Sequence, residues 1–152
     1  MMQRKLQTGR SMIEMLAVLT VIGVLTIGAV AGLNQAMQKF YTGKMHNDIL
    51  SINADVVSLY AWQRGYPSSS SSSFQSDLCR EGIFPDGCDI TGKAYNPFGG
   101  IYAVTTNTEE QTMTIEATGL PESVCEDLTI KEWPYVVEEP TCSGTTFKAT
   151  FE

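Results

Sequence analysis

The sequence predicts an α+β fold in which a long N-terminal helix packs on a small antiparallel β-sheet. Three observations support this prediction. Residues 15–33 form a run with no charge and no proline. The apolar residues that follow recur at helical spacing, and those beyond residue 100 alternate with polar residues as in strands. A chain of 152 residues has room for one compact domain beside such a helix.

The uncharged run is long enough to cross a bilayer. Its 19 residues reach about 28 Å as a helix, close to the hydrocarbon thickness of about 30 Å. Arg4, Lys5 and Arg10 precede the run, and such charges remain on the cytoplasmic side. We therefore expect a cytoplasmic N-terminus. The alternative, a secretory signal cleaved after Ala31, conflicts with the helical pattern that continues past this residue.

An apolar stripe after the run predicts that the helix extends from Met12 to Gln63. Polar residues are expected to form the opposite, solvent-facing side, and Gly65 to Pro67 end the helix. The stripe should pack against the sheet. Its members are Met37, Tyr41, Met45, Ile49, Ile52, Val56 and Leu59, and the polar side carries Gln38, Lys39, Asn47, Asp48, Asn53 and Asp55.

Four strands are predicted after a serine tract at 68–73, which we expect to be a flexible surface segment. A small antiparallel sheet needs cover on one face, and the amphipathic half of the helix fits this role. The expected strands are 101–106 and 112–117, paired as a hairpin after a turn at 96–100, and then 135–137 and 146–151.

A specific motif surrounds the start of the apolar run. A short basic leader ends at Gly9, Arg10 follows, and Glu14 is the fifth residue after the leader. This motif resembles the class III signal of type IV pilins and pseudopilins. The resemblance implies cleavage after Gly9 and N-methylation of Arg10 by a prepilin peptidase. It also implies a leader over 1–9, a transmembrane and filament-core helix over 10–33, and a globular pilin α/β-roll over 34–152.

Two positions depart from the family pattern. Arg10 stands where Phe or Met is usual. It lies four positions before Glu14, so the two side chains can pair on one helix. Ala31 stands where many type IV pilins have a proline. Gly28 and Gly32 then have two open roles, because glycine loosens a helix and a small-xxx-small pattern also allows close helix packing.

The subclass signals also conflict. Residues 96–100 and 119–125 resemble the globular domains of type IVb pilins, whereas the short leader resembles those of type IVa pilins and pseudopilins.

All four cysteines follow the apolar run, on the side that the predicted topology makes oxidising. Three pairings are possible. The sequential pairing, Cys79 with Cys88 and Cys125 with Cys142, matches two segments without predicted regular structure. In pilins a disulfide commonly closes the C-terminal loop, as Cys125–Cys142 would do here.

No enzymatic, nucleotide-binding or metal motif is apparent, so we expect no enzyme activity and no cofactor or metal. His46 is the only histidine and is expected to be a solvated helix residue. The net charge of −7 disfavours nucleic acid as a partner. Three carboxylate pairs either bind calcium weakly or form a solvated acidic surface, and we favour the surface. They are Glu109-Glu110, Glu126-Asp127 and Glu138-Glu139.

The resemblance implies a structural subunit of a type IV pilus or related filament, in which Glu14 pairs with the N-terminal amine of a neighbour. Expected partners are copies of itself, other pilins, the prepilin peptidase, an inner-membrane assembly platform with its ATPase, and membrane lipid before assembly. The expected location is the bacterial inner membrane, then an extracellular pilus or periplasmic filament.

The alternatives are a pseudopilin of a type II secretion system and a single-pass membrane protein with a periplasmic ligand-binding domain.

Overall fold

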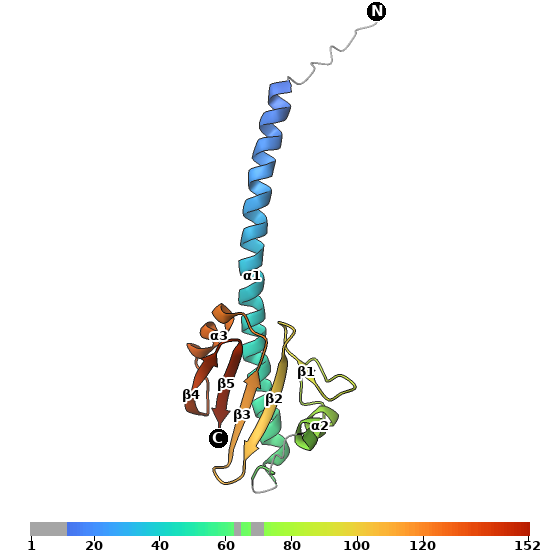
Figure 1. The fold of residues 1–152 in the computed structure, drawn as a ribbon, viewed down its shortest axis with the longest axis vertical. Helices are drawn as coiled ribbons and strands as arrows, with labels where there is room; N and C mark the ends of the chain where they lie inside the picture. Colours follow the sequence, from blue (N-terminus) through green and yellow to red (C-terminus); the bar gives the residue numbers. More distant parts are fainter. Residues whose placement is uncertain (1–11, 63–64, 68–71) are drawn as a thin grey trace, which may run out of the picture. The chain divides into compact units, whose positions relative to one another are not determined.

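A computed structural model describes residues 12–62, 65–67 and 72–152 (Figure 1). The α+β class is confirmed, with one long helix followed by an antiparallel sheet. The chain divides between Met37 and Gln38 into two units, which are described separately. In chain order the elements are α1 (Met12–Tyr60), α2 (Ser72–Arg80), β1 (Ala94–Tyr95), β2 (Ile101–Asn107), β3 (Thr112–Ala117), α3 (Glu122–Thr129), β4 (Val136–Ser143) and β5 (Thr146–Phe151).

The described strands form one sheet with the order β1-β2-β3-β5-β4, and every neighbouring pair is antiparallel. The predicted hairpin is β2 and β3, in which Val104 lies opposite Ile115. Alternate side chains of the sheet point to one buried face, as the alternation predicts. The members of this face include Tyr102, Val104, Met113, Ile115, Ala117, Phe147, Ala149 and Phe151.

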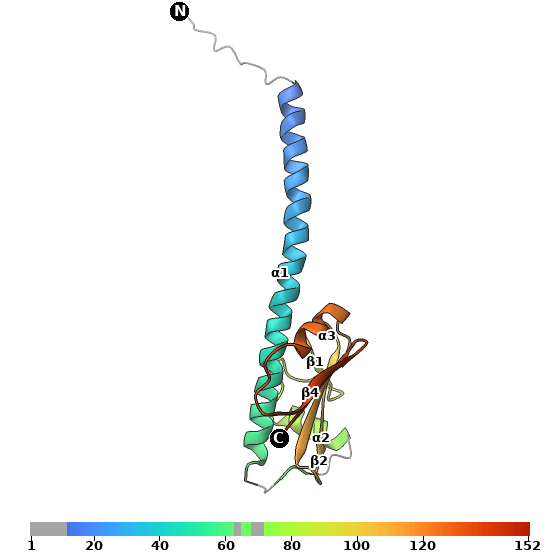
Figure 2. The same cartoon turned by 90° about the vertical axis from the view of Figure 1, so that its left-hand side faces the viewer.

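Within the domain that begins at Gln38, α1 covers this face of the sheet (Figure 2). Met45, Ile49, Ile52 and Val56 have no exposed surface, so the central part of the predicted stripe is confirmed as core. The stripe begins later than predicted, because Met37 is 43% exposed. The helix also ends earlier, at Tyr60, and Gln63 lies outside the described residues.

Two polar residues of α1 correct the expected solvent side. Asp48 and Asn53 are only 7% and 6% exposed. A helix that packs on a sheet buries two residues per turn rather than a single row. Asp48 neighbours Ile49 and Asn53 neighbours Ile52, so both flank the stripe and are covered with it.

The structure contains elements that the sequence analysis missed. Ser72 and Ser73 begin α2, and only residues 68–71 of the serine tract lie outside the described part. Helix α3 and the two-residue β1 were not predicted. Strand β4 runs on to Ser143, although it contains Pro140. Proline is tolerated here because β4 is an edge strand and its pairing with β5 shifts register around this residue.

The predicted turn at 96–100 is built on the side chain of Asn96. Its Oδ1 accepts hydrogen bonds from the N–H groups of Phe98 and Gly100 at 2.9 and 3.1 Å. Its Nδ2 donates to the carbonyl of Thr118 at 2.8 Å. Gly100 is required, because a Cβ at this position would collide with that same carbonyl oxygen.

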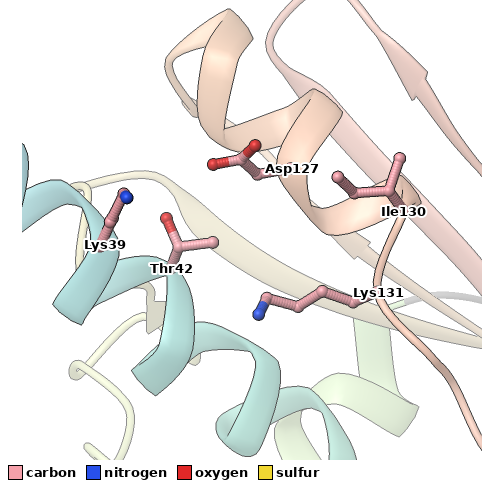
Figure 3. Close-up of a pocket in the computed structure, with 5 residues that line it drawn as sticks. All are labelled: Lys39, Thr42, Asp127, Ile130 and Lys131. Carbon is pink, nitrogen blue, oxygen red and sulfur yellow. The ribbon is translucent and has the colours of Figure 1, made fainter.

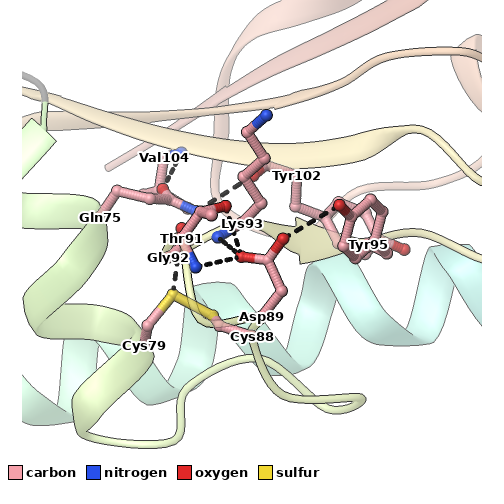
Figure 4. Close-up of a disulfide and its surroundings, with 10 residues drawn as sticks. All are labelled: Gln75, Cys79, Cys88, Asp89, Thr91, Gly92, Lys93, Tyr95, Tyr102 and Val104. Carbon is pink, nitrogen blue, oxygen red and sulfur yellow. Dashed lines mark hydrogen bonds between the residues drawn. A yellow bond between two sulfur atoms is a disulfide. The ribbon is translucent and has the colours of Figure 1, made fainter.

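Gln75 of α2 completes the outer edge of β2, where the short β1 ends. Its Nε2 donates to the Tyr102 carbonyl and its Oε1 accepts from the Val104 N–H, both at 3.1 Å (Figure 4). These two bonds replace those of a missing neighbouring strand. The edge therefore offers fewer unpaired groups to another chain.

Both disulfides follow the sequential pairing. Cys79 is bonded to Cys88 and Cys125 to Cys142, with Cα atoms 5.6 and 5.7 Å apart. The reason given for this pairing was wrong, however. Three of the four cysteines lie in α2, α3 and β4 rather than in irregular segments.

Asp89 orders the loop that follows the first disulfide. Its Oδ1 accepts from the N–H of Lys93 and from both the N–H and the hydroxyl of Thr91, at 2.7–2.9 Å (Figure 4). The Tyr95 hydroxyl donates to Oδ2 at 3.0 Å. The Lys93 N–H, followed by the Thr91 hydroxyl, lowers the pKa of Asp89 to about 2. The loop thus retains this carboxylate in its ionised, hydrogen-bonded form well into acid.

Cys142→Ser should reduce the free energy of unfolding of the domain by about 2–5 kcal/mol, since it opens a disulfide that closes 17 residues. Chemical denaturation in detergent measures this loss. Ser143→Ala, at the neighbouring exposed position of β4, should remain within about 0.5 kcal/mol of the unaltered protein. Non-reducing peptide mapping should recover Cys79 with Cys88. A peptide that joins Cys79 to Cys125 would contradict the disulfide pairing of the structure.

Candidate functional site

The N-terminal part of α1 is apolar all round and uncovered. An 18-residue window has a mean hydropathy of 2.4, and none of it is buried by the described residues. Every side chain from 12 to 40 is exposed, including Leu16, Leu19, Leu25 and Ile27. By length and composition, this helix can cross a membrane. Exposed apolar surface of this extent requires lipid or another protein to cover it.

The polar groups of this segment are satisfied within the helix. Thr20 and Thr26 are the only polar side chains between residues 15 and 33. Thr20 Oγ1 donates to the Ala17 carbonyl at 2.8 Å, and Thr26 Oγ1 donates to the Ile22 carbonyl at 2.7 Å. A helix with its hydroxyls bonded in this way meets the requirement of a hydrocarbon environment.

Gly28 and Gly32 have no packing role among the described residues. A Cβ added at either position would meet no described atom within 4 Å. The helix also continues through both residues, so neither glycine breaks it here. Whether they allow close packing or loosen the helix therefore depends on contacts with other chains.

Glu14 lies in the first turn of α1, where the partial positive charge of the helix terminus favours a carboxylate. At 100° per residue, Glu14 and Gly32 lie on the same line along the helix, and Gly28 lies about 40° away. The carboxylate and the glycine pair are separated by about 21–27 Å along the axis. One face of the helix thus carries the Glu14 carboxylate at one end and two glycines, which have no side chain, at the other.

The remaining predicted site residues lie outside the described part. Gly9 and Arg10 precede residue 12, so the expected cleavage, the expected N-methylation and an Arg10–Glu14 pair stay predictions.

The globular domain contains a buried carboxylate that the sequence analysis placed in solvent. The Tyr102 hydroxyl donates to Asp48 Oδ2 at 3.4 Å between α1 and β2. Burial raises the pKa of Asp48, and the nearby ammonium of Lys44 only partly offsets it. Burial, and then the neighbouring Asp48 carboxylate, raise the pKa of Tyr102 far above its usual value. The signal in the sequence is the position of Asp48 next to Ile49 of the apolar stripe.

Lys44 connects α1 to the loop after α2. Its Nζ lies 2.7 Å from Asp86 Oδ2, and both side chains are partly exposed. The hydrogen bond from Lys44 to Asp86 raises the pKa of the lysine. Surface ion pairs of this kind contribute little to stability, so the pair mainly fixes the position of the loop.

His46 differs from its predicted role as a solvated helix residue. It is half-buried, its Nε2 lies 3.1 Å from the Glu132 carbonyl oxygen, and its ring centroid is 4.5 Å from that of Trp133. The imidazole therefore holds the segment after α3 against α1.

The acidic pairs do not gather into a ligand set. All six of their carboxylates are exposed. Among the residues that the structure describes, no three His, Cys, Asp or Glu side chains approach one another closely enough to hold a metal ion.

A scan of protein-family models and a search of curated proteins give no match to this chain. The fold and the uncovered helix nevertheless define a broad class, an α+β domain that follows an apolar helix able to span a membrane. This architecture is compatible with a pilin-like fold.

Asp48→Asn should stabilise the domain at neutral pH. Because the folded-state pKa of Asp48 lies above its ordinary value of 3.8, the folded state binds this proton more tightly than the unfolded state does. The contribution of Asp48 is therefore most favourable below about pH 3.8 and is lost as the pH rises through the folded pKa.

Urea denaturation between pH 3 and pH 7 tests this sign, with Asp55→Asn at an exposed position of α1 as the control. The Asp48→Asn protein should lose less stability over this range than the unaltered protein. A larger loss would mean that the carboxylate stabilises the domain in its ionised form.

Proposed function

We propose that this chain is a structural subunit, a pilin, of a type IV pilus or related filament. The observation that carries the proposal is the uncovered apolar half of α1, which has a single carboxylate in its first turn. The motif from Gly9 to Glu14 gives this segment its specific interpretation. The protein then acts by assembly and performs no chemistry of its own.

In the proposed mechanism, the prepilin peptidase cleaves after Gly9 and methylates the new N-terminus at Arg10. Residues 10–33 hold the processed subunit in the inner membrane, with residues 34–152 in the periplasm. The assembly platform then transfers the helix from lipid to the filament. Lipid and neighbouring helices cover the same apolar surface in turn, so the transfer exposes little of it to water.

Glu14 sets the register between neighbouring subunits in this mechanism. It is the only charged residue among the 26 residues 12–37. Its carboxylate pairs with the N-terminal amine of a neighbour, and in an apolar setting this attraction is much stronger than in water. The pair also offsets the cost of placing a carboxylate in a low-dielectric environment.

The small face at Gly28 and Gly32 supports the same proposal. It lies on the side of the helix that carries Glu14, and the chain has no packing use for it among the described residues. Small residues at this spacing let two helix backbones approach closely. The charge then sets the axial position, and the glycine pair allows close contact further along the helix.

The mature protein is expected to begin at Arg10. Gly9→Val should block cleavage, so that the nine-residue leader remains on the membrane-bound protein. Mass spectrometry of the N-terminus measures this directly. An intact leader on the unaltered protein in membranes would support the alternative of a single-pass membrane protein with a periplasmic ligand-binding domain.

Glu14→Val should be processed normally, because Gly9 and the leader are unchanged, yet it should form no filaments. Valine is better tolerated in lipid than a carboxylate, so the processed monomer should accumulate in the membrane. Filament counts by microscopy and a membrane immunoblot measure the two effects, with each variant expressed as the only copy.

Two matched variants separate charge from shape. Glu14→Gln retains the length and removes the charge, so it should also fail to assemble. Glu14→Asp retains the charge on a shorter side chain and should restore some filaments. Normal filaments from Glu14→Val would overturn the charge-pair mechanism and leave packing around Gly28 and Gly32 as the source of cohesion.

A further inference from the structure

A pocket of about 390 Å³ lies between α1 and α3, entirely within the domain that begins at Gln38 (Figure 3). Helix α1 contributes Lys39 and Thr42, and α3 contributes Asp127. Ile130 and Lys131 follow directly after the end of α3.

The pocket brings together charges of both signs that have not paired. The side chains of Lys39, Asp127 and Lys131 all project into the space between α1 and α3 (Figure 3). Among the described residues, no ion pair within 4 Å engages any of these three side chains. The pocket thus has separated cationic and anionic groups, with space between them.

The two positive charges of the pocket stand out because the domain as a whole is acidic. Residues 34–152 carry sixteen carboxylates and only seven lysines or arginines. Two of the seven, Lys39 and Lys131, line this one pocket. A pair of ammonium groups in an acidic domain indicates a ligand with a negative charge, such as a phosphate.

The pocket also contains hydrogen-bond acceptors, one from α1 and one from α3 (Figure 3). Thr42 Oγ1 donates its proton to the Gln38 carbonyl at 2.8 Å, so its oxygen is left to accept a hydrogen bond. The exposed carboxylate of Asp127 is a second acceptor. Two acceptors beside two lysines match a ligand that carries a phosphate and an ammonium group together.

The position of Lys39 in the sequence indicates where such a ligand is abundant. Lys39 is the first charged residue after Glu14, and it follows Leu33, the end of the apolar run, by six residues. This short separation in sequence keeps Lys39 close to the end of the apolar run. Beside Lys131, Ile130 is 81% exposed, and an apolar side chain next to a lysine suits a membrane surface.

We propose that the pocket lined by Lys39, Thr42, Asp127 and Lys131 binds the headgroup of a membrane phospholipid that carries a primary ammonium. The two lysines bind the phosphate, and Asp127 and Thr42 Oγ1 accept hydrogen bonds from the ammonium. The inference rests on the membrane-inserted stage of the proposed function and does not require a filament. Headgroup binding holds the domain at the bilayer surface before assembly.

The test uses the full-length protein in maltoside micelles, which contain no phosphate. Dihexanoyl phosphatidylethanolamine is titrated in, and the backbone amide resonances of Thr42 and Lys131 are followed by NMR. Both resonances should shift and saturate. Dihexanoyl phosphatidylcholine should bind at least threefold more weakly, because its methylated ammonium donates no hydrogen bond. Inorganic phosphate alone should not saturate the shift over the same range.

Charge-removing variants assign the roles. Lys39→Gln and Lys131→Gln should each weaken binding of the phosphatidylethanolamine at least fivefold. Asp127→Asn should abolish the preference over phosphatidylcholine. Lys148→Gln is the matched control, because this lysine pairs with Glu116 at 3.4 Å on the sheet and does not line the pocket.

Three results would overturn the proposal. They are the absence of a saturable shift in the unaltered protein, an equal response to inorganic phosphate, and an equal loss of binding in Lys148→Gln. The titration of the unaltered protein decides the first two even where a variant fails to fold. Because binding is measured on the isolated subunit, its failure is distinguishable from a failure of Glu14-dependent assembly.

Discussion

The physical constraint on which the rest of the molecule depends is the apolar surface of the first half of α1. The domain that begins at Gln38 has its own core, and no residue of the 18-residue apolar window is buried in the described structure. Water is therefore an unfavourable environment for this part of the chain. Lipid or another apolar protein surface can cover it, because both are apolar and neither competes for the backbone hydrogen bonds.

The globular domain meets the opposite requirement, since it must be stable without help from that segment. One face of α1, from Met45 to Val56, lies on the inner face of the sheet and forms the core with it. The two disulfides attach the short helices α2 and α3 to the segments that follow them. These helices add few apolar residues of their own, and covalent bonds replace the packing that they lack.

The long helix and the central strands could be predicted from the sequence because each repeats its pattern over many residues. Between Met45 and Val56, four buried apolar residues recur on one face of α1. On β5, three buried residues alternate with polar ones, namely Phe147, Ala149 and Phe151. The short elements give no such repetition. Helix α3 buries only Val124, Cys125 and Leu128, and Pro140 argues against a strand that the sheet edge in fact tolerates.

The residues proposed for the site differ in how far the sequence alone can point to them. The motif at Gly9 to Glu14 and the glycine spacing at 28 and 32 are local in sequence and can be read directly. The pocket at Lys39 and Lys131 could not be predicted in this way, since the two lysines are 92 positions apart in the sequence and only the position of α3 beside α1 brings them together. The burial of Asp48 likewise depends on Tyr102, which lies on another element.

The two edges of the sheet limit how copies of this domain can associate. At one edge β1 is short and Gln75 occupies the next backbone groups of β2, and at the other β4 carries Pro140 and shifts in register. Neither edge can readily accept a strand from a second molecule. Many copies can then be crowded together without their sheets merging into a cross-β aggregate. Contacts between domains must be made by side chains, so they can change by single substitutions while the fold stays the same.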